Sequence, residues 1–291
     1  MKYLLEIGLF IIVLFLYLHI YYHLKVSNDL EVYSIQQPSK DKLEEVCNLR
    51  QPLYFDMINE DILQTCNLSY IDENYNPFDV KIRDNTSEDK DNLYLPVSLK
   101  EAIKLFKNDD NGKYITEKNQ DFLEETAMVK NYRYNDSFLR PPLVSNCKYD
   151  FITGSKNSFT PLRYNLNYRN FFYVTSGTVK VLLIPPKNSK YLYEYKDYDN
   201  FEFRSPINPW NVQDNFKKEF EKIKSLEITL EKNNILFIPP YWWFSIQYQE
   251  ISSVACFYYR TYMNTLAISP EICMNLLQQT NVKHEFLEKV E

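Results

Sequence analysis

The chain has 291 residues, of which 45% are hydrophobic and 16% aromatic, so it can bury one sizeable core or two modest ones. Its formal net charge of -6 and its lack of a basic block argue against nucleic-acid binding, which requires clustered Lys and Arg side chains. The 4 glycines are isolated and the 5 cysteines are scattered, which excludes a phosphate-binding glycine loop, a serine-hydrolase elbow and a paired-cysteine zinc site.

The first predicted element is a transmembrane helix over residues 3–22, YLLEIGLFIIVLFLYLHIYY. About 20 apolar residues are needed to cross the hydrocarbon core of a bilayer. A cleaved signal peptide is the alternative, but it requires small residues after the apolar stretch, and the following HLKVSNDLEVY has no A-x-A pattern. We therefore predict a single-pass membrane protein with a retained anchor over residues 1–25 and a juxtamembrane segment over residues 26–37. Lys2 and Lys25 flank the span almost evenly, so the orientation stays open.

Helices and a strand follow in the soluble part. Residues 38–49 (PSKDKLEEVCNL) and 97–108 (VSLKEAIKLFKN) have apolar residues spaced for one helix face, and each begins near a serine suited to an N-cap. Residues 50–57 (RQPLYFDM) are predicted as a strand. The segment 67–91 is rich in Asp, Asn and Glu, and its composition predicts a loop.

From residue 150 onward the pattern changes to short β-branched and aromatic runs bounded by Pro, Asn and Gly. These runs are residues 170–186, 225–240, 244–249 and 251–262. Strands of this length and spacing predict an antiparallel sandwich or barrel, and so a mainly β fold with flanking helices. The tail, residues 269–291, is predicted as a C-terminal helix with Ser269 as N-cap; it either mediates dimerisation or covers the open end of the barrel.

The order of motifs in this part of the chain is similar to that of a known family. The motifs are RQPLYF, KYITEKNQDFLEE, ITGSKNSFTPLRYN, NFFYVTSGTVKVLLIPP and ILFIPPYWWFSI. This order resembles the cupin-like, JmjC-related family of Fe(II) and 2-oxoglutarate oxygenases, relatives of the asparaginyl hydroxylase that acts on hypoxia-inducible factor. Membrane-anchored proteins of giant DNA viruses look similar too. The resemblance implies a cupin-like domain over residues 38–268 with a double-stranded β-helix, or jelly-roll, fold.

Enzymes of this family bind iron through two histidines and one carboxylate. The resemblance places Arg163, Asn165 and Phe244 at these three positions, and Val179 at the position of the lysine that binds 2-oxoglutarate. Arginine cannot lose its proton to bind a metal, and phenylalanine has no lone pair to offer. Independently of any alignment, residues 24–283 contain no histidine. We therefore predict no metal and no cofactor, and we expect Phe244 to fill the cavity that the metal left.

Several residues match lining positions of the family pocket or carry a charge near it. Thr160, Asn170, Phe172 and Trp243 are the candidate lining residues, although Trp243 is equally suited to core packing. Arg163 is a candidate for binding a small anionic ligand, a carboxylate or a phosphate; the alternative is that it pairs with a neighbouring Asp or Glu or reaches solvent. The strand periodicity predicts that Arg163, Asn165, Val179 and Phe244 surround one cavity. Arg169 and Lys180 are expected on solvated faces.

Two functions are compatible with these observations. The first is a catalytically inactive module in a viral or host membrane, which binds a protein partner, self-associates or has a structural role. The second is an enzyme of the 2-oxoglutarate oxygenase superfamily with altered, metal-independent chemistry. The first is favoured because no Ser/His, Cys/His or metal-binding constellation replaces the one that is missing.

Overall fold

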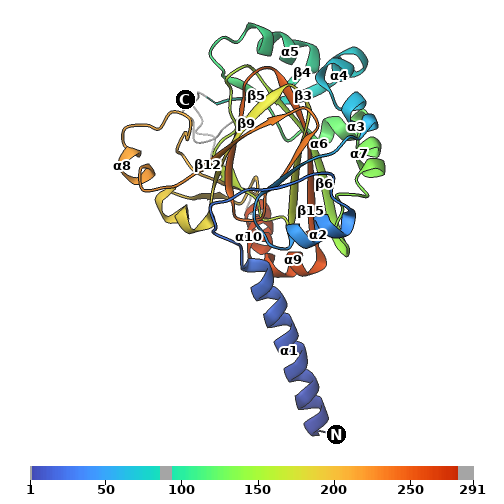
Figure 1. Cartoon of the computed structure of the whole chain (residues 1–291), viewed down its shortest axis with the longest axis vertical. Coiled ribbons are helices and arrows are strands. Elements are labelled where there is room, and N and C mark those ends of the chain that lie inside the picture. The colour runs from blue at the N-terminus through green and yellow to red at the C-terminus, as the bar shows by residue number, and fades with distance from the viewer. Residues whose placement is uncertain (1, 86–93, 281–291) are drawn as a thin grey trace, which may run out of the picture.

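A helix projects from a domain made of two sheets in the computed structural model, which describes residues 2–85 and 94–280 (Figure 1). This helix, α1 (Lys2–Leu24), contains the whole predicted span. Its most apolar stretch has no buried residues, and it is long and apolar enough to cross a membrane. A signal sequence near the N-terminus would have the same length and composition.

The strands form two sheets, in which every neighbouring pair except β1 and β2 is antiparallel. The larger sheet has the order β1 (Tyr33–Ile35), β2 (Leu53–Asp56), β13 (Asn234–Phe237), β8 (Arg169–Ser176), β15 (Ser252–Thr261), β6 (Val144–Gly154), β5 (Tyr114–Thr116), β3 (Asp79–Asp84) and β4 (Leu95–Ser98). The smaller sheet has the order β10 (Tyr195–Asp197), β11 (Glu202–Arg204), β7 (Arg163–Tyr164), β14 (Trp243–Tyr248), β9 (Thr178–Ile184) and β12 (Leu226–Glu231). The prediction of a mainly β fold is therefore confirmed.

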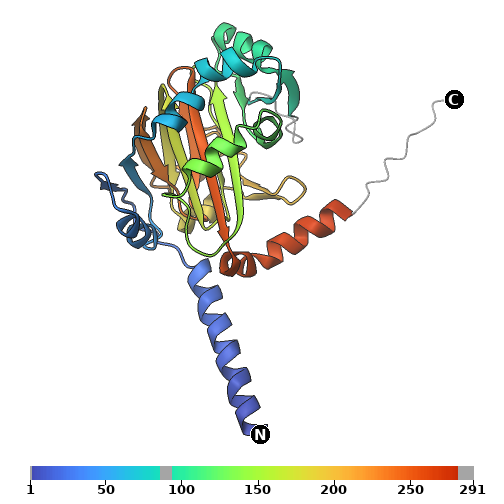
Figure 2. The ribbon, with the colours of Figure 1, turned by 90° about the vertical axis from the view of Figure 1, so that its right-hand side faces the viewer.

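Helices flank the two sheets. They are α2 (Lys40–Cys47), α3 (Glu60–Thr65), α4 (Leu68–Tyr75), α5 (Leu99–Asn108), α6 (Gln120–Glu125), α7 (Val129–Asn135), the short 3-10 helix η1 (Pro186–Tyr191), α8 (Lys217–Phe220), α9 (Tyr262–Ala267) and α10 (Ser269–Thr280). Both predicted internal helices form, because the side chains of Ser39 and Ser98 accept hydrogen bonds from the first-turn amides of α2 and α5. Figure 2 shows that α10, the red helix, extends away from the sheets.

The core has two layers, which meet at the larger sheet. In β8, Phe171 and Tyr173 pack on the helical side, whereas Phe172 and Val174 pack between the two sheets. Because successive side chains of a strand point to opposite faces, a strand with apolar partners on both sides loses its polar alternation. This explains why β8 reads as a nearly continuous buried run.

The predicted loop over residues 67–91 is wrong for most of its length. It contains α4 and β3, and the stretch 86–91 lies outside the described residues. The side chain of Asn67 accepts a hydrogen bond from the amide of Tyr70, and Ile71 is buried. The polar composition therefore reflects helix capping as well as solvent exposure.

Arg169 is a second correction, because it is buried and does not lie on a solvated face. Its guanidinium donates to the carbonyl of Cys47 and to Oδ1 of Asn48, each at 2.7 Å, and so links β8 to the end of α2. Lys180, in contrast, pairs with Glu227 at the surface, as expected.

Candidate functional site

Two strands of the smaller sheet bring Arg163 and Phe244 together. β7 and β14 are antiparallel, and the residues paired between them are Arg163 and Phe244. Directly opposed residues of such strands have Cα atoms about 4.5–5.5 Å apart. The Arg163 guanidinium carbon lies 5.8 Å from the centroid of the Phe244 ring. The structure thus places Arg163 and Phe244 side by side.

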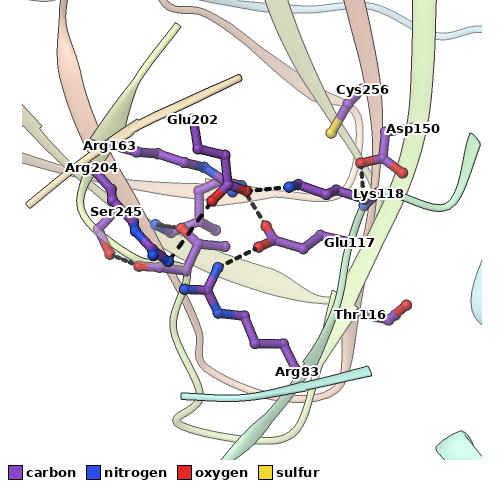
Figure 3. A network of polar contacts seen from close by, with 12 residues as sticks. Arg83, Thr116, Glu117, Lys118, Asp150, Arg163, Glu202, Arg204, Ser245 and Cys256 are labelled. Carbon is purple, nitrogen blue, oxygen red and sulfur yellow. Dashed lines mark hydrogen bonds and ion pairs between the residues drawn. The ribbon is translucent and has the colours of Figure 1, made fainter. Parts of the chain in front are cut away.

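The partner of Arg163 is the carboxylate of Glu117, whose side chain is 2% exposed. Nη2 of Arg163 lies 2.5 Å from Oε2 of Glu117, and Nη1 of Arg83 lies 3.2 Å from Oε1. The hydroxyl of Tyr94 donates to the same Oε1 at 2.7 Å. Figure 3 shows Arg83 of β3 and Arg163 of β7 approaching the carboxylate of Glu117. Hydrogen bonds between ionised groups are the stronger kind, and here they are shielded from water.

A second carboxylate, that of Glu202, extends this network. Lys118 Nζ lies 2.7 Å from Glu202 Oε1, and Arg204 Nη1 lies 3.9 Å from Oε2. The Tyr94 hydroxyl is 3.3 Å from Glu202 Oε1, within hydrogen-bonding distance of both carboxylates. We call this set the Glu117 cluster; it consists of Arg83, Tyr94, Glu117, Lys118, Arg163, Glu202 and Arg204.

The charges in the cluster stabilise each other. Burial by itself raises the pKa of Glu117, but Arg163 and Arg83 outweigh this effect and lower the pKa from 4.5 to about 2. Burial lowers the pKa of Arg163, whereas Glu117 raises it, and the net pKa lies above the usual range. Arg163 therefore has the neighbouring acidic partner that was the alternative to a small anionic ligand.

Phe244 belongs to the apolar core between the two sheets. It is fully buried, and its ring centroid lies 5.1 Å from that of Phe172. Val179 is buried in the same core and pairs with Tyr248 of β14. Phe244 pairs with Leu183, four residues further along β9, so Val179 and Phe244 are separated by about 13 Å along the strands.

The remaining candidate lining residues are structural. Thr160, Asn170, Phe172 and Trp243 are all buried. Thr160 Oγ1 accepts a hydrogen bond from a backbone amide of β14 at 2.9 Å, and Asn170 Nδ2 donates one to the carbonyl of Ile238 at 3.0 Å. The indole N–H of Trp243 donates to a serine hydroxyl of η1 at 2.8 Å.

A pocket of about 320 Å³ opens beside the Glu117 cluster. Arg163 and Asn165 line it, whereas Phe244 and Val179 do not. Its other walls are formed by Lys81, Glu117, Lys118, Gln120, Asp121, Lys148, Tyr149, Asp150, Tyr164, Leu166, Asn167, Asn200, Phe201, Glu202, Phe203, Tyr258 and Arg260. The four residues expected around one cavity are thus divided, because the two apolar ones pack in the core.

Sequence reasoning missed both carboxylates of the cluster. Glu117 directly follows β5 within the motif KYITEKNQDFLEE, so a carboxylate at a strand end was the available signal. Glu202 offers no such signal, because it lies in the short hairpin of β10 and β11. It reaches the cluster only through the pairing of β11 with β7.

The iron and 2-oxoglutarate that the resemblance implies do not fit this site. Arg163 has only donor groups and is bound to Glu117, Phe244 has no lone pair, and Asn165 offers a single amide oxygen. Within residues 2–85 and 94–280, no three His, Cys, Asp or Glu side chains are grouped so that they could hold a metal ion.

A sequence profile of the cupin-like domain matches residues 38–265. The matched segment begins just before α2 and extends into α9, and it contains every residue of the site described above.

Proposed function

Because the chain belongs to the cupin-like domain family, we propose that it is a membrane-anchored, catalytically inactive member that acts as a binding or structural module. The strand order supports a double-stranded β-helix for its core. Four central strands of the larger sheet, β13-β8-β15-β6, face four of the smaller sheet, β7-β14-β9-β12, and the chain passes repeatedly between them. Eight strands divided in this way between two sheets are the jelly-roll arrangement of cupins.

One observation carries the proposal of inactivity. Two of the three residues that the resemblance assigns to iron binding have structural roles: Arg163 forms an ion pair with the buried Glu117, and Phe244 packs against Phe172. Converting these positions to a metal site would require breaking the ion pair and opening the core. A partner protein or a structural contact needs neither change.

We expect the purified full-length chain in detergent to form no succinate from 2-oxoglutarate in the presence of Fe(II). We also expect no increase in Tm with Fe(II), Mn(II) or Zn(II) and 2-oxoglutarate, since a ligand that binds only the folded state must stabilise it. An active oxygenase of the same superfamily, assayed in parallel, is the positive control. Metal-dependent succinate formation by this chain would overturn the proposal of inactivity.

The way the domain holds the end of α1 supports a retained anchor. The buried guanidinium of Arg50 donates to the carbonyls of His23 and Lys25, at 2.8 and 2.9 Å. Carbonyls at a helix C-terminus have no partner within the helix, and a basic side chain satisfies them. Arg50 also lies 4.2 Å from the centroid of the Tyr22 ring. Cleavage of a signal sequence near this point would remove contacts that the folded domain makes.

The second expected result is that the chain stays in the membrane pellet after carbonate extraction at high pH, with its N-terminus intact. A peripheral protein bound to the same membranes should appear in the supernatant. A soluble product with a new N-terminus after Tyr22 would identify the apolar helix as a signal sequence. The resemblance to proteins of giant DNA viruses leads us to propose a viral or host membrane, which immunodetection in purified virions would test.

A further inference from the structure

The last turns of α1 are partly covered by the domain. α9 is the helix against which α1 packs. The residues of α1 that lose exposure toward this end are Leu16, His19, Ile20 and His23. Their spacing of three and four residues places them on one helix face. α1 therefore meets the domain along a stripe of side chains, and Arg50 fixes its final carbonyls.

This contact determines the depth of α9 if α1 spans a membrane. A helix rises 1.5 Å per residue, so residues 3–22 extend over about 30 Å, the thickness of the hydrocarbon core. Leu16 lies six residues before the end of that stretch, or about 9 Å along the axis. An element that packs beside this part of α1 is held at the level of the membrane interface. Figure 1 shows α9 at the point where α1 leaves the domain.

The outer surface at this point is apolar and uncharged. Tyr262 and Leu266, one turn apart on α9, are 66% and 40% exposed, and the neighbouring Leu143 is 77% exposed. The amide of Tyr262 donates to the carbonyl of Leu143, which keeps the two residues adjacent. Residues 261–269 contain no charged side chain, although 25% of the chain is charged. We call Leu143, Tyr262 and Leu266 the α9 patch.

We propose that the α9 patch lies in the interfacial layer of the membrane that α1 spans, so that the domain rests on the lipid in one fixed orientation. The occupant of the patch is lipid because α9, which carries Tyr262 and Leu266, packs against the end of α1 and is held at interface depth by that contact. Tyrosine suits the headgroup level, and leucine suits the acyl boundary just below it. This inference rests on the anchoring role proposed for α1.

The test places a tryptophan in the patch and measures its contact with lipid. Tyr262→Trp and Leu266→Trp variants of the full-length chain are incorporated into phosphatidylcholine vesicles, with and without brominated acyl chains that quench indole fluorescence on contact. The matched control is Tyr134→Trp, since Tyr134 is 85% exposed and lies on α7 (Figure 1), far from α1. The emission of the wild-type protein, which comes from its native tryptophans, is subtracted from that of each variant. A Tm equal to that of the wild type shows that each variant is folded.

We expect brominated lipid to remove most of the added emission at positions 262 and 266 and to leave that at position 134 unchanged. If the added emission of each vesicle-bound variant is the same in brominated and in unbrominated lipid, the patch does not touch the membrane. It then faces either water or a second copy of the chain. That outcome overturns the inference and leaves the anchor intact. Failure of the wild-type chain to float with the vesicles would instead refute the anchor itself.

Discussion

Replacing Glu117 with glutamine is expected to lower the free energy of unfolding by about 3–5 kcal/mol, the usual cost of removing one partner from a buried ion pair. The amide keeps the size of the carboxylate but not its charge. Arg163 and Arg83 would then lie side by side without the anion that holds them together. Urea unfolding of the full-length chain in mild detergent, followed by tryptophan fluorescence, measures this difference.

An exposed ion pair provides the matched control. Lys180 and Glu227 are 3.4 Å apart, with side chains 39% and 51% exposed. Because water screens such pairs, Glu227→Gln should cost less than about 1 kcal/mol. Equal effects of the two substitutions would mean that the Glu117 cluster does not have the burial described for it.

The stabilisation from Glu117 should also depend on pH in a defined direction. Folding lowers the pKa of Glu117 from 4.5 to about 2, so the folded state favours the ionised carboxylate. Its contribution is complete above pH 4.5 and is lost as the pH falls from 4.5 to about 2. The difference in stability between wild type and Glu117→Gln should therefore shrink over this range. A difference that stays constant down to pH 2.5 would contradict the assigned shift.

Truncating Phe244 to alanine is expected to destabilise the chain by about 3–5 kcal/mol, the range observed for a buried phenylalanine. The ring fills space between the two sheets, where it packs against the ring of Phe172 at a centroid distance of 5.1 Å. Phe244→Leu should cost less, about 1–3 kcal/mol, because most of the volume remains. Thermal and urea unfolding of both variants would establish the order.

Tyr134→Ala is the control for this series, since an exposed aromatic side chain on α7 should contribute within about 0.5 kcal/mol. The comparison separates two roles for Phe244. A side chain that lines an open ligand cavity can be shortened at little cost, whereas one that packs in the core cannot. A Phe244→Ala variant as stable as wild type would favour the cavity and weaken the case for an inactive site.

Local patterns were sufficient for the helices α1, α2, α5 and α10 and for the strands β2, β8, β9 and β12–β15, but not for the other helices and strands. The helices α2 and α5 follow from apolar spacing and a serine cap. The strands β8 and β9, which belong to different sheets, follow from two β-branched runs separated by the turn at Gly177, whose φ is +75°. The apolar residues 3–22 also predict the helix α1. These helices and strands depend on residues close together in the chain, so the amino-acid sequence of each segment is enough to predict them. The loop predicted over residues 67–91 failed because Asn and Asp serve both turns and helix caps.

The site depended on contacts between distant segments. Sequence motifs predicted that Arg163, Asn165, Val179 and Phe244 surround one cavity, but tertiary packing pairs Arg163 with Phe244 and places Phe244 and Val179 in the core. They did not predict the partner of Arg163, which is 46 residues away in the chain, nor that Arg169 is buried against the end of α2. The residue type of a charged side chain does not show whether it lies in water or in a core. Its burial and its partners are determined only when tertiary packing brings strands and helices from separate parts of the chain around it, as at Glu117 and at the junction of Arg50 with α1.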